Sequence, residues 1–589
     1  MLGKVKVVAE AAGDRGLDLV YPLRLQYLPH VLPRLDVCIL GSTQLPGSLL
    51  ANIFKSLSTP VLAHHIISAD PLSRIFLVRS ATMGRFYRGF VPLKGLVLQG
   101  CITVCSAMTF LMFGYDQGVF GGLIAIPAVL ADLNIPAKDA NLQGTVVAIF
   151  DIGCLVGCAI CALFGEKLGR RIFIIIGALF IILGAALQAG APDWRMMVGG
   201  RVVAGIGVGM ETSFIPIWVS ECARAAYRGA LVAVQMSIVL MGLVVSYWFD
   251  YGTVKNLKGG IVWRLPLAFQ AVFVCITLIT IWALPESPRW LYKKGSIDDA
   301  DDVIARIYSV PIDDIYVKRH REEVLQALEA EKEVTFRLKD IFFDSSKVNT
   351  SWRIWVCVII QFLQQLGGIN FIAYYAAYLF INNLGMTQHT ATLTAGGLSL
   401  VFWGGSLTSI YTVERFGRRP VLLWGAVACS TCMICYTIGL AVFNQASLTM
   451  AVVFIFLFDF SFGASWCIVP WMYSPEVTPL HVRHVGTAMA VGMEWLMTFV
   501  IVKVGPIGIQ NVGWKFYILF CVFNVAQVIF VYFAVKETKG LTLEEIDYVW
   551  AKPEYKAELE ARLHSIEHEH HQLEKPDPSI HVEGEGLTD

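Results

Sequence analysis

Polar side chains and glycines interrupt one strongly apolar stretch of the chain, residues 361–375, which has the sequence QFLQQLGGINFIAYY. Gln361, Gln364 and Gln365 are spaced at i, i+3 and i+4, so their amides share one face of a helix. The Gly-Gly pair that follows weakens the helix. Because amides both donate to and accept from hydroxyl groups, this face could bind a hydroxyl-rich solute. The alternative is that the amides only hydrogen-bond a neighbouring helix.

Two residues of opposite charge, Asp116 and Arg201, also lie inside apolar segments. An unpaired charge in a membrane costs at least about 2.5–3.5 kcal/mol, so we expect the two to pair or to line water. Further acidic residues in such segments are Asp151, Glu211, Asp459 and Glu494. We interpret Asp151 and Glu211 as structural.

The composition indicates an all-α protein that crosses a membrane many times. The 589 residues are 56% hydrophobic and 16% charged, with a mean hydropathy of +0.60, which is more apolar than a soluble core requires. Twelve apolar segments reach the roughly 20 residues that a spanning helix needs. They lie at residues 96–120, 143–164, 172–190, 196–219, 229–250, 264–284, 353–381, 391–413, 420–443, 448–473, 486–506 and 514–535.

Several function classes are not supported by the sequence. The formal net charge is zero, which gives no reason to expect a nucleic-acid partner. The two C-x-x-C pairs lie in apolar runs and are interpreted as packing residues. We find no nucleophile with a base and no set of metal ligands, so we expect no enzyme, no cofactor and no metal.

The spans fall into two bundles of six, residues 96–284 and 352–535, separated by a charged linker with short helices at 285–351 and followed by a charged tail at 536–589. Basic residues cluster after even-numbered spans, so the positive-inside rule places both termini, the linker and the tail in the cytoplasm. Prolines break residues 1–95 before any run reaches spanning length. These residues are either a disordered extension or sequence absent from the mature product, with translation starting at Met83.

The two halves carry matching charged motifs. GEKLGRR follows the second span and VERFGRR the eighth, and a glutamate precedes an arginine by seven residues after the fourth and the tenth. This duplication indicates a parallel repeat with the substrate between the halves. We expect a cytosolic gate of salt bridges that hold one conformation and break in another; for any single arginine, the alternative is a charge that only sets topology. The gate would comprise Glu166, Arg170, Arg171, Glu221, Arg228, Glu414, Arg418, Arg419, Glu476 and Arg483.

Residues 361–375 closely resemble the motif QQ-x-x-G-x-N-x-x-x-YY of the seventh helix in sugar porters of the major facilitator superfamily. The GRR motifs, GYD at 114–116, RVVAGIGVG from Arg201, PESPRWL at 285–291 and KETKG at 536–540 are similar to further motifs of that family. The resemblance extends from about residue 114 to 545 and is strongest to fungal members. It implies the major facilitator fold of twelve helices and transport of a sugar by alternating access.

The resemblance also implies roles for individual residues. In proton-coupled members, the aspartate matching Asp116 takes up the proton and the arginine matching Arg201 tunes when it does so. The alternative is a permanently ionised structural pair, because some facilitative relatives keep this aspartate. The implied substrate site consists of Gln235, Gln364, Gln365, Asn370 and Tyr374, with Trp471 placed to cover the apolar face of a sugar ring.

The sequence departs from the family at three substrate positions. Phe402 stands where an asparagine of the eighth helix is expected, and Glu494 and Thr498 stand where two asparagines of the eleventh are common. We include Phe402 and Glu494 in the predicted substrate site. The pocket is therefore more apolar at Phe402 and more acidic at Glu494, which could suit a disaccharide, a polyol, a glycoside or another organic solute.

We accordingly predict a monomeric transporter in the plasma membrane that moves a sugar or polyol together with protons across the lipid bilayer. Two alternatives remain. One is a carrier of a different organic solute on the same fold. The other is a sensor that binds sugar without transporting it, although residues 536–589 are a short tail for a sensor.

Overall fold

The computed structural model describes residues 87–222, 228–333, 341–342, 346–479, 482–541 and 543–557. The predicted N-terminal extension, residues 1–95, therefore lies outside the described residues except at 87–95, and so does the tail beyond residue 557.

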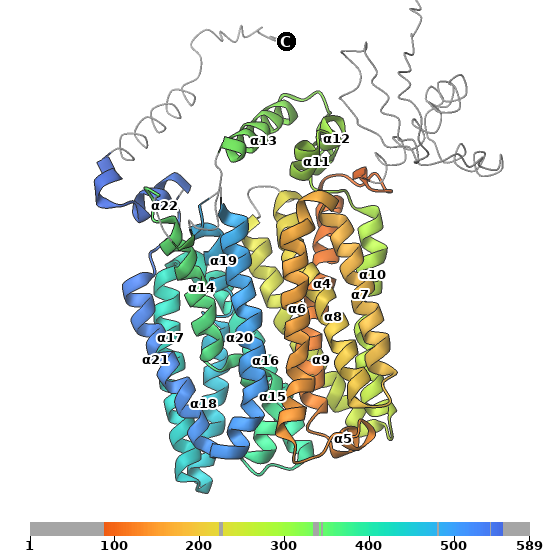
Figure 1. Ribbon diagram of the computed structural model, residues 1–589, viewed down its shortest axis with the longest axis vertical. Coiled ribbons are helices and arrows are strands. Elements are labelled where there is room, and N and C mark those ends of the chain that lie inside the picture. Colours follow the sequence, from red (N-terminus) through yellow and green to blue (C-terminus); the bar gives the residue numbers. More distant parts are fainter. Residues whose placement is uncertain are drawn as a thin grey trace, which may run out of the picture. The chain divides into compact units, whose positions relative to one another are not determined.

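The described chain is built from helices (Figure 1). The first group contains α4 (Gly95–Leu123), the short α5 (Pro127–Asp132), α6 (Ala140–Leu168), α7 (Arg170–Ala189), α8 (Trp194–Cys222), α9 (Arg228–Asn256) and α10 (Ile261–Ala283). The linker contains α11 (Pro288–Lys294), α12 (Ile297–Tyr308) and α13 (Ile315–Glu333). The second group contains α14 (Thr350–Leu366), α15 (Ile369–Asn382), α16 (Gln388–Phe416), α17 (Arg418–Val442), α18 (Gln445–Gly463), α19 (Val469–Val477), α20 (Arg483–Val512), η4 (Gly513–Phe516) and α21 (Tyr517–Ala534), before α22 (Leu543–Trp550) and η5 (Pro553–Tyr555).

In the described part of the chain, 11 helical stretches are long and apolar enough to cross a membrane. The last of them, Val485–Ala534, has 50 residues and contains both α20 and α21. At 1.5 Å per residue it would exceed twice the roughly 30 Å of a hydrocarbon core, so it must cross twice. The resulting twelve spans confirm the predicted all-α membrane fold.

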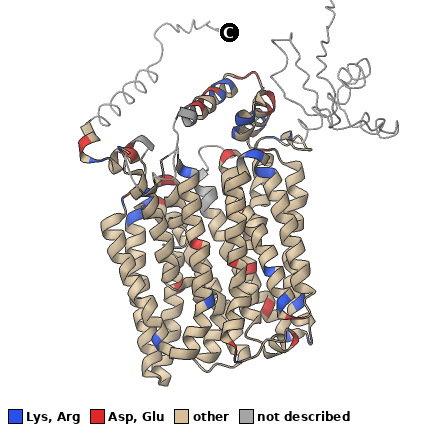
Figure 2. Ribbon diagram, in the orientation of Figure 1, with Lys and Arg blue, Asp and Glu red and all other residues tan. Residues whose placement is uncertain are grey.

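The elements outside the spans define two ends of the bundle. Figure 1 shows α11, α12, α13 and α22 beyond one end of the spanning helices, which we call the linker end, and α5 at the opposite, distal end. Charged residues gather on these outer elements and at the helix ends, whereas the spans are mostly uncharged along their length (Figure 2). This distribution is what a bilayer around the spans requires.

Glycines allow α6 and α8 to pack at very short range. A Cβ atom on Gly205 would lie 2.2 Å from the carbonyl oxygen of Phe150, and one on Gly209 would lie 2.1 Å from that of Cys154. Small residues at helix crossings are a common packing device in membranes. The glycine series after Arg201 therefore brings α8 against α6.

Residues 87–94, which the sequence analysis assigned to the extension, are held by the linker. Arg306 of α12 donates to the carbonyl oxygens of Val91 at 2.8 Å and Leu93 at 2.9 Å, and also to that of Arg88. Burial lowers the pKa of Arg306. The ordered lead into α4 is thus fixed by a linker arginine.

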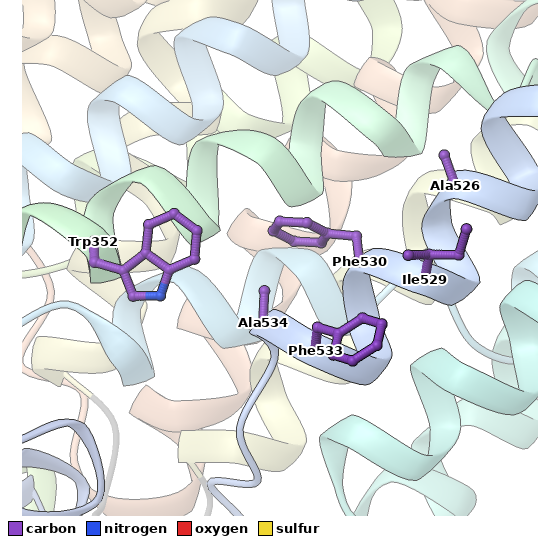
Figure 3. A pocket seen from close by; sticks show the side chains of 6 residues that line it. All are labelled: Trp352, Ala526, Ile529, Phe530, Phe533 and Ala534. Atoms are coloured by element: carbon purple, nitrogen blue, oxygen red, sulfur yellow. The ribbon is translucent and has the colours of Figure 1, made fainter.

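An apolar groove lies on the outer side of α14 and α21. It is lined by Trp352, Ala526, Ile529, Phe530, Phe533 and Ala534 (Figure 3). Ile529 and Phe533 are 56% and 81% exposed, as expected of side chains that face hydrocarbon. The groove contains none of the predicted substrate residues and is a lipid-facing surface.

Candidate functional site

The seventh span is broken between α14 and α15. Gly368 has φ +94°, and a Cβ atom there would lie 2.8 Å from the ring of Phe520. Asn524 of α21 donates to the carbonyl oxygen of Gly367 at 3.0 Å, and Gln527 donates to that of Leu363 at 2.8 Å. The amide of Asn524 satisfies the Gly367 carbonyl, which the break leaves without a backbone donor in the described chain, and Gln527 gives the Leu363 carbonyl a second donor besides the N–H of Gly367. Asn524 and Gln527 were not among the predicted residues, although two amides at i, i+3 in an apolar run were a usable signal.

A continuous chain of hydrogen bonds links the amides of the seventh span to α20. Gln365 donates to Oε1 of Glu494. Asn370 donates to Oε1 of Gln365 at 2.7 Å and to the hydroxyl of Thr498 at 3.0 Å. The two positions of α20 at which the sequence departs from the family therefore belong to the same polar cluster, which we call the amide chain: Gln365, Asn370, Glu494 and Thr498.

Several polar atoms near this cluster have no hydrogen-bond partner among the described residues. Both amide atoms of Gln361, which is fully buried, are in this state, as are Oε1 of Gln364 and Oε2 of Glu494. Nε2 of Gln364 donates to the carbonyl oxygen of Trp466 at 2.8 Å, at the break between α18 and α19. Buried polar atoms are usually paired, so these groups are candidates for binding a polar solute or water.

Asp116 and Arg201 form the predicted pair. Oδ1 of Asp116 and Nη1 of Arg201 are 3.9 Å apart, and both side chains are fully buried. Nη2 of Arg201 donates to the carbonyl oxygen of Val147 at 3.1 Å, and its guanidinium lies 5.0 Å from the ring centres of Phe120 and Phe150. At 3.9 Å the contact is an ion pair without a hydrogen bond.

The two adjacent tyrosines of the motif form hydrogen bonds with different halves of the protein. The hydroxyl of Tyr374 donates to Oδ1 of Asp151 on α6 at 3.3 Å, which is a contact between the two halves. The hydroxyl of Tyr375 donates to the carbonyl oxygen of Val502 on α20 at 3.2 Å, within its own half. Asp151, interpreted from sequence as structural, thus touches the substrate motif.

The remaining predicted substrate residues are not joined to the amide chain. Gln235 donates to the hydroxyl of Ser106 on α4 at 2.6 Å. The ring of Phe402 packs against Phe462 of α18, with ring centres 6.1 Å apart. Trp471 of α19 is partly exposed. In the described part of the chain, no hydrogen bond or ring contact connects these three side chains to the amide chain.

At the linker end of the first half, charged side chains surround the start of α7. Arg170 donates two hydrogen bonds to Glu221 of α8, both at 3.1 Å. Glu286 accepts hydrogen bonds from the backbone N–H groups of Arg170 and Arg171. These groups lie at the N-terminus of a helix and have no acceptor inside it. Burial raises the pKa of Glu286. Arg171 also donates to the carbonyl oxygens of Ile281 and Trp282.

The second half repeats this arrangement. Arg418 donates to Glu476 at 2.8 and 3.1 Å, and Glu537 accepts from the backbone N–H groups of Arg418 and Arg419 at the start of α17. Both ion pairs join helices of the same half. Of the other expected gate residues, Glu414 lies 3.9 Å from Arg418 and Arg483 begins α20, whereas the side chains of Glu166 and Arg228 lie outside the described part of the structure.

Several hydrogen bonds join the two halves at the distal end. Lys503 of α20 donates to the backbone and side-chain oxygens of Asn141 at 2.7 and 2.6 Å, and also to Thr145. Gln510 donates to the carbonyl oxygen of Lys138 at 3.0 Å. The distal end is therefore held closed by hydrogen bonds across the interface.

Two helix bundles with a buried ion pair and a polar cluster near their interface define a membrane transporter of the facilitator type. Residues 102–550 match the family described as "Sugar (and other) transporter", and the chain belongs to this family of the major facilitator superfamily. It is an integral membrane transport protein and not an enzyme.

Three relatives illustrate the similarity. The chain is 36% identical to the MFS-type transporter oryC of Aspergillus oryzae, over 78% of this chain and 86% of that protein. It is 31% identical to the sugar transporter STL1 of Saccharomyces cerevisiae, over 78% and 82%. A solved structure of the proton:xylose symporter XylE bound to 6-bromo-6-deoxy-D-glucose matches with a TM-score of 0.67 and 25% identity, over 77% of this chain and 99% of that one.

Proposed function

We propose that this protein carries a sugar or a sugar-like solute across the plasma membrane together with protons, by alternating access between its two halves. The observation that carries the proposal is the fully buried pair of Asp116 and Arg201, 3.9 Å apart. The match to a structure described as a proton:xylose symporter supports both the solute class and the coupling.

The pair can couple proton binding to conformation because only one of its members can lose its charge. Protonation of Asp116 would remove the attraction to Arg201, whose guanidinium keeps its charge at physiological pH. The freed arginine would then favour a different arrangement of α4 and α8. A solute that binds more tightly to one arrangement would shift the same equilibrium.

We propose that the amide chain and the unpartnered atoms of Gln361 and Gln364 bind the hydroxyl groups of the solute. Amides and a carboxyl group offer donors and acceptors at several points, as a hydroxyl-rich molecule requires. Trp471, Gln235 and Tyr374 remain proposed contacts, and Phe402 remains a proposed apolar wall. The proposed assembly is a monomer.

A second candidate solute is favoured by Glu494. A carboxyl group accepts hydrogen bonds at its oxygens and, unlike an amide, offers at most one donor, and Oε2 of this residue has no partner in the described chain. A polyol or a glycoside that presents hydroxyl donors at this point would bind better to Glu494 than to the asparagine that is usual in the family.

We assign the linker end to the cytoplasm, with both termini on that side, following the positive-inside rule. The gate residues would then act by fixing the helix ends on the cytoplasmic side. Each of the pairs Arg170–Glu221 and Arg418–Glu476 would keep the linker end of its own half rigid, so that the halves rock as bodies.

The test is uptake of labelled sugars, polyols and organic acids in yeast cells that lack their own hexose carriers. We expect accumulation of a sugar or polyol above the external concentration, abolished by a protonophore. Uptake that only equilibrates and ignores the protonophore would contradict coupling. Binding at the cell surface without uptake would favour the sensor.

A further inference from the structure

The region around Asp151 holds more acidic groups than its single arginine can neutralise. Asp116, Asp151 and Glu494 are all buried, and Arg201 interacts electrostatically with both Asp116 and Asp151. The titratable groups that face Asp151 are Asp116 from α4, Arg201 from α8, Tyr374 and Tyr375 from α15 and Glu494 from α20, together with Cys154 on its own helix.

One guanidinium compensates one carboxylate, and a further unpaired charge is costly in hydrocarbon. In the conformation described, Arg201 is 3.9 Å from Asp116. Asp151 and Glu494 are then neutral when Asp116 is ionised, which means that each carries a proton. If Asp116 is protonated instead, Arg201 becomes available to compensate an ionised Asp151.

Asp151 also bridges the two halves. Its Oδ1 accepts a hydrogen bond from Tyr374 across the interface at 3.3 Å, while its Oδ2 has no partner among the described residues. Opening of the distal end would separate α6 from α15, break this bond and admit water to the carboxyl. Exchange of its proton with water is therefore controlled by the position of the halves.

We propose that Asp151 is a second proton-carrying carboxyl of the transport cycle, which shares Arg201 with Asp116 and senses closure of the distal end through Tyr374. This inference rests on the proton coupling proposed above. The step is a simple protonation: a proton from water binds the carboxylate to give the neutral acid and later returns to water, while Tyr374 keeps its hydroxyl proton throughout.

The direct test is infrared spectroscopy of the full-length protein in lipid vesicles, in which the C=O stretch of protonated carboxyl groups is followed during a pH titration. It needs no solute. Among the titrating bands, we expect one that Asp151→Asn removes and that remains in Asp116→Asn. In Tyr374→Phe the band should persist to higher pH, because the ionised carboxylate has lost a donor. A wild-type spectrum unchanged by Asp151→Asn would overturn the assignment.

Glu211→Gln is the matched control. Glu211 of α8 is a buried carboxyl without hydrogen-bond partners in the described chain. Its replacement removes an acid of the same kind outside the cluster. It should leave the titrating band of Asp151 in place.

Transport measurements distinguish the proposed role of Asp151 from the proton coupling on which it rests. Vesicles with an inward proton gradient are given labelled D-xylose, D-glucose and glycerol. Loss of accumulation in Asp151→Asn, with accumulation retained in Glu211→Gln, supports the role of Asp151. If Asp116→Asn fails to accumulate while Asp151→Asn accumulates like the wild type, symport stands and the role of Asp151 falls. If the wild type takes up one of the three solutes only to the external concentration and ignores the proton gradient, both the proton coupling and the role of Asp151 are contradicted.

Discussion

Arg170 of α7 and Glu221 of α8 form a two-point contact, with both hydrogen bonds at 3.1 Å and side chains only 15% and 12% exposed. Arg418 and Glu476 form the same contact in the second half. The sequence duplication therefore corresponds to a duplicated ion pair at matching helix ends.

This geometry predicts a graded effect of substitutions at Arg170. Arg170→Ala should lower stability by about 1.5–3 kcal/mol, the range for hydrogen bonds to charged groups. Arg170→Lys keeps the charge but loses the planar fork, so its effect should be smaller. Thermal unfolding in detergent measures both. Arg319→Ala is the control, because its pair with Glu323 is 75% and 57% exposed and should contribute little. Equal losses for Arg170→Ala and Arg319→Ala would contradict the account.

Gly368→Ala should impair both stability and transport. The residue has φ +94°, which alone costs roughly 1–3 kcal/mol for a side chain, and the added Cβ would also meet Phe520 at 2.8 Å. Gly385→Ala is the matched control, since Gly385 has φ +66° and open space around it. Comparison of the two unfolding temperatures isolates the clash. A decrease in unfolding temperature no larger than that of Gly385→Ala would show that the break between α14 and α15 tolerates a side chain.

Much of this architecture could be predicted from the sequence. Apolar runs of spanning length and the duplicated charges determine the fold, because a bilayer leaves few alternatives for such segments. Asp116 and Arg201 could be paired in advance because an isolated charge in either helix is costly. These predictions depend on composition and on periodicity within one helix.

Contacts between distant helices were harder to predict. Nothing in the sequence near Asp151 indicates that Tyr374, 223 positions away, donates to it. The support of the broken helix by Asn524 and Gln527 depends in the same way on how α21 packs against α14. The ring contact between Phe402 and Phe462 is a further example, because the family motif indicates the position of Phe402 but not its neighbour on α18.

Glu494 should set solute preference. Glu494→Asn removes the carboxyl group that accepts from Gln365 and restores the residue usual in the family. We expect the ratio of D-glucose to D-sorbitol uptake, each expressed as kcat/KM, to rise about tenfold, equivalent to about 1.4 kcal/mol. Glu211→Gln controls for loss of a buried acid elsewhere. An unchanged ratio in Glu494→Asn would remove Glu494 from the proposed substrate site.

Lys503 should stabilise the closed distal end. Lys503→Met keeps most of the length of the side chain but removes all of its donors to Asn141 and Thr145. Hydrogen–deuterium exchange of residues 138–145 and 503–512 should become faster, because local opening costs less free energy. Lys515→Met is the control, since Lys515 is an exposed lysine of η4 at the same end. Similar exchange rates in the two variants would argue against stabilisation of the distal end by Lys503.

The most direct test of proton coupling is to record the pH inside vesicles that contain the full-length protein while solute is added outside. D-xylose, D-glucose and glycerol are tested in turn. For the wild type, we predict that at least one solute acidifies the interior, because each transported molecule brings a proton with it. For Asp116→Asn, we predict no acidification by that solute. Acidification by Asp116→Asn at the wild-type rate would contradict the assignment of Asp116 as the proton acceptor.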